Sequence, residues 1–424
     1  TQIPIKSIPH EVSPATSNRS QAVSTLHDLI LDATTSKVGR SDRVAVLLGG
    51  LDSALVAALL RRQGLEVHTF TFGFKDQKYE QQHAQSFSKR IGAIHHTVPI
   101  TPEIIMKGLQ GFADLSHQPG SQPHYQIHTI HASSVISNAG FDHVFTGDGC
   151  DSVFLGYPTV SRRAALTKRF GSLPNPLAQI GISLLSSPFV EHKLGHVARI
   201  GRNTLNNALL PMPESGHLPT RYLDDVALSR IREDLPSQHY SVDEIRTELA
   251  SAVKHLDPIR LAYHGNGLNG QSKAKVDGAL SLTGVTHSTP FLDPKLRNFV
   301  SALPTDFLRS AHDSAASSGK AILIEMIKKY HLLPDVIVDQ PKQSPSDSPV
   351  DIWYSGALRN EVLDLLSNLP FPVNQTGINS LLRHKWAEDW YRERVSLSHH
   401  ALQSIGLLCT YASFSQVTKH KHCD

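Results

Sequence analysis

The chain has 424 residues, of which 40% are hydrophobic and 19% charged, a composition typical of a globular protein with a large core and room for more than one lobe. The net charge of +3 gives no electrostatic reason to expect a nucleic acid or an anionic membrane as partner. Three cysteines without a Cys-x-x-Cys pair argue against a disulfide framework or structural zinc and favour a reducing cytoplasm.

Hydrophobic periodicity predicts an α/β fold. Residues 1–20 form an irregular leader, and a helix over 21–35 follows. The next segments alternate between strands and helices, which is typical of a doubly wound parallel sheet. The predicted strands are Val44–Leu48, Glu66–Phe74, Ile94–Val98 and Asp142–Thr146. The expected division is an irregular leader (1–20), an α/β core (21–160) and a largely helical part (161–424).

The first chemical motif is Leu48-Gly49-Gly50-Leu51-Asp52-Ser53, between a strand and a helix. Loop amides and a helix N-terminus at such a turn can bind a phosphate, and Ser53 can add a hydroxyl donor. Asp52 would repel a phosphate unless a divalent cation lay between them, which suggests Mg²⁺. An ordinary strand-to-helix turn remains an equally good interpretation of this motif alone.

A second acidic loop, Gly147-Asp148-Gly149-Cys150-Asp151, follows the strand Asp142–Thr146. The carboxyl ends of parallel strands meet at one edge of the sheet, where ligands bind, so Gly49 and Gly147 are expected there together. Asp52 and Asp151 are then candidates to hold one Mg²⁺. The alternative is that Asp151 only caps a helix.

Two lysines further along the chain are candidate ligand-binding residues. Lys320 begins an apolar helix, where the helix dipole disfavours a cation, which hints at an anionic partner. Lys342 lies in a polar loop that resembles a lid ordering over a ligand.

Together these motifs resemble a known family. Leu48–Ser53 is similar to the Ser-Gly-Gly-x-Asp-Ser loop of ATP pyrophosphatases, and Thr146–Tyr157 is similar to a Ser-Gly-Glu-Gly-x-Asp-Glu-x-Phe-x-Gly-Tyr block. Lys275-Val276-Asp277 and Pro290-Phe291-Leu292-Asp293 resemble a third block with the same internal spacing. In this order, from Val23 to Lys342, they resemble the synthetase domain of asparagine synthetase B and the β-lactam synthetases.

The resemblance implies a ligase that uses ATP and Mg²⁺. It makes residues 21–160 the ATP-binding core, and residues 161–424 the part that completes the synthetase domain and its active-site lid. A carboxylate of a small molecule or peptide would attack the α-phosphate of ATP, and an amine would then attack the acyl-adenylate to give an amide and AMP. The resemblance leaves a homodimer open. It assigns catalysis to Asp148, Lys320 and Lys342, metal binding to Asp52 and Asp151, and nucleotide binding to Leu47, Leu48, Gly49, Gly50, Asp52, Ser53, Phe72, Gly73 and Gly147.

Several departures from the family pattern narrow the expected reaction. Leu48 replaces the first serine of the loop, which removes one side-chain donor to pyrophosphate. Gly278 and Thr286 replace an Arg and a Glu of the family block, and this change makes aspartate a doubtful substrate. Because the chain starts about twenty residues before the synthetase-type helix, no internal glutaminase is expected.

The favoured function is an amide, lactam or macrolactam synthetase of specialised metabolism, such as antibiotic biosynthesis. Ammonia-dependent asparagine synthesis, a degenerate ATP-binding protein and a tRNA-modifying pyrophosphatase are the alternatives.

Overall fold

The computed structural model describes residues 18–39, 41–74, 78–116, 119–120, 122–157, 173–187, 189–190, 198, 201–202, 204–205, 282–309, 319–339, 349–369 and 405–415. Among these residues, no helix is both long and apolar enough to cross a membrane. The division of the chain at residues 20 and 160 stays a prediction.

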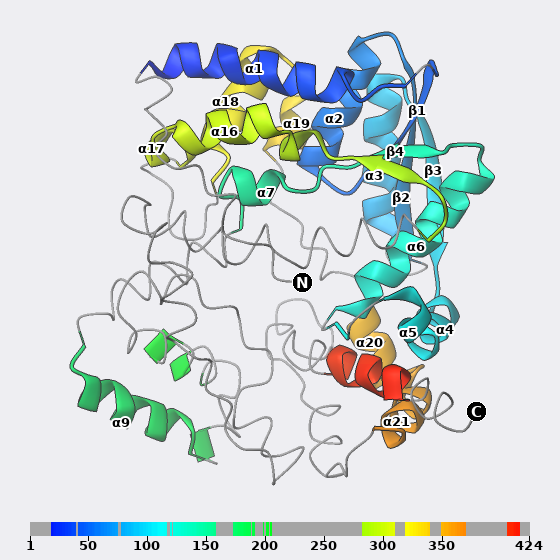
Figure 1. The fold of residues 1–424 in the computed structure, drawn as a ribbon, viewed down its shortest axis with the longest axis vertical. Coiled ribbons are helices and arrows are strands. Elements are labelled where there is room, and N and C mark those ends of the chain that lie inside the picture. Colours follow the sequence, from blue (N-terminus) through cyan, green and yellow to red (C-terminus); the bar gives the residue numbers. More distant parts are fainter. Residues whose placement is uncertain are drawn as a thin grey trace.

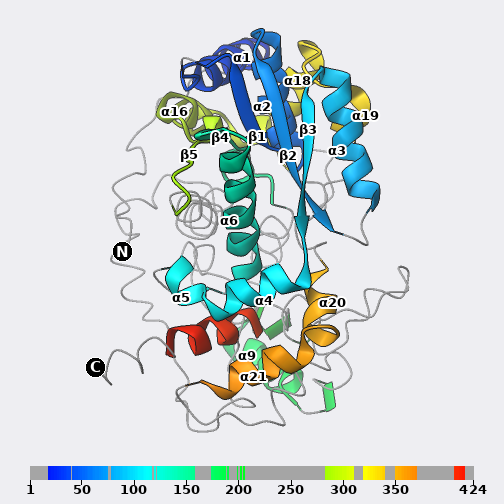
Figure 2. The same cartoon turned by 90° about the vertical axis from the view of Figure 1, so that its right-hand side faces the viewer.

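A five-stranded parallel sheet forms the centre of the fold, with the strand order β3-β2-β1-β4-β5 (Figure 2). Its strands are β1 (Arg43–Leu47), β2 (Glu66–Phe74), β3 (Ile94–Ile100), β4 (His143–Phe145) and β5 (Thr286–Ser288). The expected α/β fold with a parallel sheet is therefore confirmed. The fifth strand, β5, was not predicted.

The order of the strands reverses at β1. The chain runs from β1 outward through β2 to β3 and then returns to the other side of β1 for β4 and β5. In sheets of this kind the crevice outside the carboxyl ends of the two strands at the reversal is where ligands bind. Here those strands are β1 and β4.

One face of the sheet is covered by α1, α2, α3, α16 and α18 (Figure 1). Val44 and Val46 of β1 belong to this core, whereas Ala45 between them belongs to the opposite one, as the alternation of side chains along a strand requires. The helices on this side are α1 (Arg19–Thr35), α2 (Leu51–Arg62), α3 (Lys78–Ile91), α16 (Pro294–Ala302), α17 (Thr305–Leu308), α18 (Ala321–Lys329) and α19 (Asp335–Val338).

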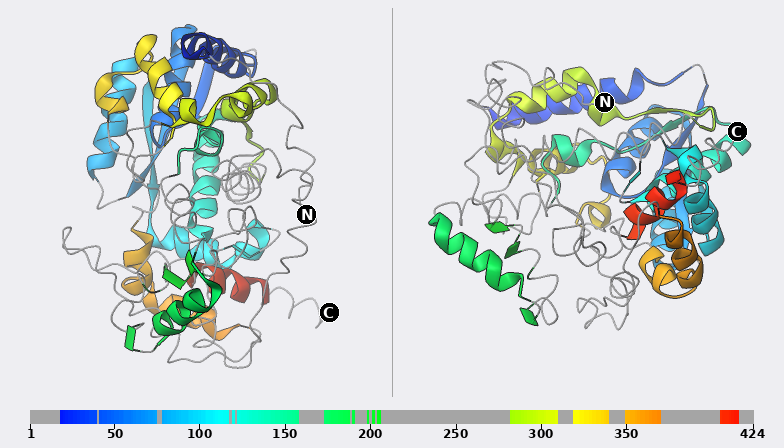
Figure 3. Two further views of the ribbon diagram at one scale, coloured as in Figure 1. Left: turned by 90° about the vertical axis from the view of Figure 1, so that its left-hand side faces the viewer. Right: turned by 60° about the horizontal axis from the view of Figure 1, so that its bottom comes forward.

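The other face is covered by α6 (Pro123–Asn138), which packs on β2 and β3. Beyond it lie α4 (Pro102–Gln110), α5 (Phe112–Leu115), α20 (Val350–Ser355), α21 (Arg359–Ser367) and a helical segment over 405–415 (Figure 3). Ser413 fixes that last segment to α4 and α5, because its Oγ donates to the Gln110 carbonyl and accepts from the Ala113 N–H. Ile405, Leu408, Cys409 and Ala412 of this segment also belong to the hydrophobic core on this face of the sheet.

Candidate active site at the carboxyl ends of β1 and β4

The glycine loop between β1 and α2 closes on Ser53. The Oγ of Ser53 accepts hydrogen bonds from the N–H groups of Gly49 (2.9 Å) and Gly50 (3.2 Å) and donates to the Gly50 carbonyl at 3.1 Å. Both glycines are exposed, and a Cβ on either would meet nothing within 4 Å. The two loop residues are therefore accessible, but their amides donate to Ser53 Oγ, so a phosphate oxygen would have to replace this hydroxyl as their acceptor.

Leu48 lies under this loop and not at its mouth. Its side chain is 6% exposed and belongs to the core that α1 and α2 cover. Its backbone is also committed, because its N–H donates to the Phe70 carbonyl at 2.8 Å and its carbonyl accepts from Thr71 Oγ1 at 3.0 Å. Leu48 therefore anchors the loop and offers a ligand no hydrogen-bond donor.

The acidic loop after β4 contacts the glycine loop directly. A Cβ on Gly147 would lie 2.5 Å from the Ser53 backbone nitrogen and 2.9 Å from the Asp52 Cβ, so only glycine fits here. Gly149 has φ +85° and precedes the short helix α7 (Cys150–Val153). Asp148, between these glycines, is half-buried. The expected meeting of the Gly49 and Gly147 loops is thus observed.

Lys320 reaches this site from α18, far along the sequence. It adopts a left-handed conformation (φ 69°, ψ 15°) at the N-cap of α18, and its N–H donates to the Phe154 carbonyl at 2.8 Å. The neighbouring Gly319 N–H donates to the Leu155 carbonyl at 3.1 Å. A Cβ on Gly319 would lie 2.4 Å from both carbonyl oxygens. This close approach of two backbones directs the lysine side chain inward.

The ammonium of Lys320 lies between Asp52 and Asp151. Its Nζ is 2.6 Å from Asp52 Oδ1, 2.8 Å from Asp52 Oδ2 and 2.7 Å from Asp151 Oδ1. We call these three residues the ionic centre. The lysine is only 6% exposed. Two carboxylates that share one ammonium leave one negative charge in excess, in a place where water screens it little.

Burial and the neighbouring charges both shift the pKa values in the ionic centre. Burial raises the pKa of Asp52; the Lys320 ammonium opposes this rise and the Asp151 carboxylate adds to it. Burial alone would lower the pKa of Lys320, but the surrounding acidic groups outweigh it and raise this pKa above its ordinary value. Lys320 therefore stays charged, and the centre attracts further positive charge.

Cys150 is a member of this site that sequence reasoning did not select. Its thiol is fully buried and hydrogen-bonds to the Asp52 carboxylate. Burial raises the pKa of the thiol, so Cys150 is a neutral donor and not a nucleophile. Its position between Gly149 and Asp151 in the acidic loop was the one available signal.

The donor set of the ionic centre suits Mg²⁺ bound together with phosphates. Mg²⁺ is commonly held by one or two carboxylates and completes its coordination with phosphate oxygens and water. Asp52 and Asp151 converge on one point, occupied by the lysine nitrogen, and both are acidic oxygen donors. No group of three metal-ligating side chains occurs among the described residues.

The other predicted site residues lie at the ends of β1 and β2 or outside the described part of the chain. Leu47 ends β1, and Phe72 and Gly73 lie near the carboxyl end of β2, where a Cβ on Gly73 would meet Thr97 Cγ2 at 2.3 Å. Thr286 begins β5, beside Asp142, at the amino end of the sheet. It therefore gives no support to an altered substrate pocket. Lys275, Asp277, Gly278 and Lys342 lie outside the described residues.

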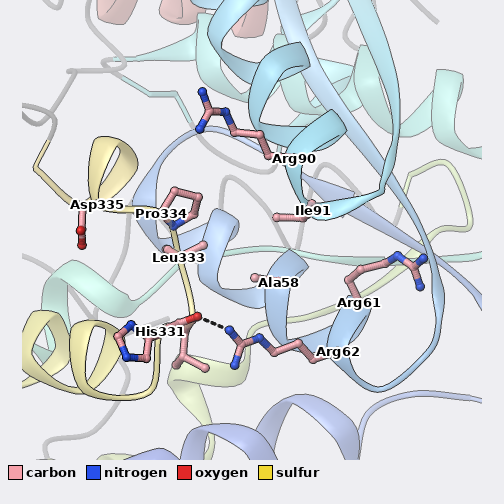
Figure 4. A pocket seen from close by; sticks show the side chains of 10 residues that line it. Ala58, Arg61, Arg62, Arg90, Ile91, His331, Leu333, Pro334 and Asp335 are labelled. Carbon is pink, nitrogen blue, oxygen red and sulfur yellow. Dashed lines mark hydrogen bonds between the residues drawn. The ribbon is translucent and has the colours of Figure 1, made fainter.

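A separate cavity of about 500 Å³ lies at the other end of the sheet (Figure 4). It is lined by the C-terminal turns of α2 and α3 and by the connection from α18 to α19. Arg62 on its wall donates to the carbonyls of Tyr330 and His331, and thus ties α2 to that connection. The cavity contains none of the predicted site residues.

The fold and site define a parallel α/β protein with an acidic, glycine-lined crevice at the reversal of its strand order. The asparagine synthase family model matches residues 25–409, which is far more than half of the chain. The chain therefore belongs to the asparagine synthase family.

Individual relatives are more distant. Proteins of Mycobacterium bovis and Mycobacterium tuberculosis, each named "Putative asparagine synthetase (glutamine-hydrolyzing)", are 25% identical over 305 residues, or 69% of this chain. The match spans only 44% of the length of those relatives. The structure of an NMN synthetase from Francisella tularensis overlaps with a TM-score of 0.24 at 16% identity, over 33% of this chain and 58% of that one.

Proposed function

We propose that this protein is an ATP-dependent, AMP-forming synthetase that adenylates a carboxylate, releases pyrophosphate and joins the acyl group to an amine. The observation that carries this proposal is the ionic centre: two aspartates and a lysine from three distant segments meet beside exposed glycine amides at the reversal of the strand order. Membership of the asparagine synthase family, a family of carbon–nitrogen ligases, supports the same reaction class.

In this proposal the residues of the crevice act mainly by binding charge. The Gly49 and Gly50 amides receive phosphate oxygens, and Asp52 and Asp151 hold Mg²⁺, which when bound neutralises charge on the leaving pyrophosphate. Lys320 and Lys342 stabilise the same developing charge. Asp148 is within the acidic loop and is proposed to accept a proton from the attacking amine.

The acid and the amine are a finer part of the proposal. We propose a substrate other than aspartate and an amide or lactam product of specialised metabolism, because Gly278 replaces an Arg of the family pattern. The cysteine usage of the chain supports a cytoplasmic location as a further part of the proposal. Leu48 favours a second candidate, a degenerate ATP-binding protein, because its buried side chain offers no donor to pyrophosphate. Asparagine synthesis, the activity in the names of the mycobacterial relatives, is a third outcome.

The test is pyrophosphate release from ATP and Mg²⁺ across a panel of amino-acid and diamino-acid carboxylates, with AMP followed in parallel. Equal amounts of both products with one panel member are expected. Asp52→Asn and Asp151→Asn should each abolish release, whereas Asp42→Asn, at the amino end of β1, should not. Bound ATP without any pyrophosphate in the presence of every acid would favour the degenerate binder.

Lys342 has its own test within this assay. If it belongs to a lid that closes over ATP, Lys342→Ala should lower turnover far more than it weakens ATP binding. Equal losses of both would mean that Lys342 only contributes to binding.

A further inference from the structure

The Nζ atom of Lys320 lies where the carboxylates of Asp52 and Asp151 converge. Three carboxylate oxygens lie within 2.8 Å of its Nζ, and this is the point that a cation shared by Asp52 and Asp151 would occupy. We infer that Lys320 is a built-in counter-ion which holds the Mg²⁺ position in the nucleotide-free protein and is displaced when Mg²⁺ arrives with a nucleotide. The inference rests on the proposed function and adds a regulation of metal entry to it.

Charge explains why such a counter-ion is needed. Asp52 and Asp151 are mostly covered, with 19% and 18% of their side chains exposed. Two carboxylates so close together and without a cation would repel each other and lose much of their hydration. The lysine removes most of this cost, so the site stays assembled without metal. For the same reason, free Mg²⁺ must compete with a bound ammonium.

Exchange is favoured only when phosphates are present. Mg²⁺ between the two carboxylates makes them neutral as a group, and the released ammonium then needs a new anion. The phosphates of a nucleotide supply that anion at the exposed residues Gly49 and Gly50, whose amides donate to Ser53 Oγ until a phosphate oxygen replaces it. Metal and nucleotide are therefore expected to bind together, and each alone only weakly.

The backbone around Lys320 allows this exchange with little movement. The left-handed conformation of Lys320 is sparsely populated by residues other than glycine and is held by hydrogen bonds to the carbonyls of Phe154 and Leu155. Gly156 leaves just enough space, because a Cβ there would lie 2.4 Å from Lys320 Cε and 2.2 Å from Asp151 Oδ1. Withdrawal of the ammonium then requires rotation about the side-chain bonds of Lys320, away from Gly156 and Asp151.

The first experiment measures metal binding without nucleotide. Mn²⁺ is titrated into the wild-type protein and into Lys320→Gln, with electron paramagnetic resonance as the readout. Lys320→Gln is expected to bind one Mn²⁺ at least tenfold more tightly than wild type and to gain thermal stability from millimolar Mg²⁺. Adding Asp151→Asn to this variant should cancel both effects. Affinity no higher than that of wild type would overturn the inference.

Lys328→Gln is the matched control for this titration. Lys328 also lies on α18 and forms an ion pair with Asp339 at 2.8 Å, but that pair is exposed and far from the glycine loop. Its loss should leave Mn²⁺ affinity unchanged. A gain equal to that of Lys320→Gln would mean that any reduction of positive charge suffices, and would also overturn the inference.

The second experiment uses wild-type protein and does not depend on whether the variant folds. A crystal structure with Mg²⁺ and a non-hydrolysable ATP analogue should show the metal between Asp52 and Asp151, with Lys320 Nζ withdrawn from both carboxylates. A lysine that still contacts both carboxylates beside the bound metal would refute displacement. Neither experiment requires turnover, so a silent pyrophosphate assay would count against the proposed reaction and not against the exchange.

Discussion

Gly147 is the residue at which the two loops of the candidate site touch. Gly147→Ala would place a methyl group 2.5 Å from the Ser53 backbone nitrogen, which forces the loops apart. We expect a loss of about 1–3 kcal/mol in the free energy of unfolding and a large loss of ATP affinity. Denaturant unfolding and nucleotide titration measure these effects. Gly111→Ala, whose nearest neighbour would be 3.6 Å away, is the control and should change neither.

His128 on α6 makes the stability of the protein sensitive to acid. Burial lowers the pKa of this imidazole from 6.5 to about 3. Below pH 6.5 the unfolded chain takes up a proton that the folded protein does not bind until about pH 3, so stability falls as the pH drops through this window. Between pH 7 and pH 5 this effect costs about 2 kcal/mol.

His128→Leu is expected to remove that part of the acid sensitivity. The Nε2 of His128 has no hydrogen-bond partner among the described residues, so the substitution breaks no bond to this atom. Urea unfolding at pH 7 and pH 5 should show a decrease smaller by about 2 kcal/mol than in wild type. His331→Asn, at an exposed position, is the control. An unchanged decrease in His128→Leu would show that other groups carry the acid sensitivity.

The Pro-Phe-Leu-Asp motif at residues 290–293 leads directly into helix α16. Asp293 is the N-cap, and its Oδ1 accepts from the N–H groups of Lys295 (2.9 Å) and Leu296 (3.4 Å). Asp293→Ala should lower the free energy of unfolding by about 1 kcal/mol, whereas Asp293→Asn retains the cap and should cost much less. Thermal unfolding of both variants distinguishes a capping role from one that needs the charge.

Most elements of the described core could be predicted, because local patterns determine them. The bounds of β2 agree with the expected ones, and Gly64, Gly92 and Gly140 have the positive φ that ends a helix. The strand β5 was missed because Thr286–Ser288 carries no apolar run or alternation. Its pairing with β4 depends on tertiary structure, which periodicity does not report.

The C-terminal segment over 405–415 is part of the core of the whole molecule. Leu408 is 5% exposed in the cluster on the α6 face of the sheet. Leu408→Ala should therefore lower the free energy of unfolding by about 2–5 kcal/mol, which chemical denaturation can measure. Tyr411→Ala, in the same segment but 46% exposed, should have little effect. Similar losses in both variants would contradict a core position for Leu408.

The sequence indicated the loops and the charged residues of the candidate site, but not which of these residues form ion pairs with one another. The two loops and the three charged residues follow from strand ends and a helix start. That Lys320 pairs with Asp52, 268 residues earlier, could not be derived, because no local pattern encodes a contact of that separation. For the same reason the hydrogen bonds of Ser53 within its loop and the place of Cys150 beside Asp52 were not predicted, because the direction of a hydroxyl and the partner of a thiol depend on packing. The assignment of Ser53 to nucleotide binding stays a prediction.

The long sequence separation within the site also affects how the protein folds. Contacts between distant segments form late, because their loops must close before the contact stabilises anything. The sheet itself needs such a closure, since His143 meets Thr286 across 143 residues, and Lys320 must arrive later still in chain order. During refolding, binding of ATP with Mg²⁺ should recover after the circular-dichroism signal of the helices. Recovery of nucleotide binding would then measure the folding of the chain as far as Lys320, and not the folding of its amino-terminal half alone.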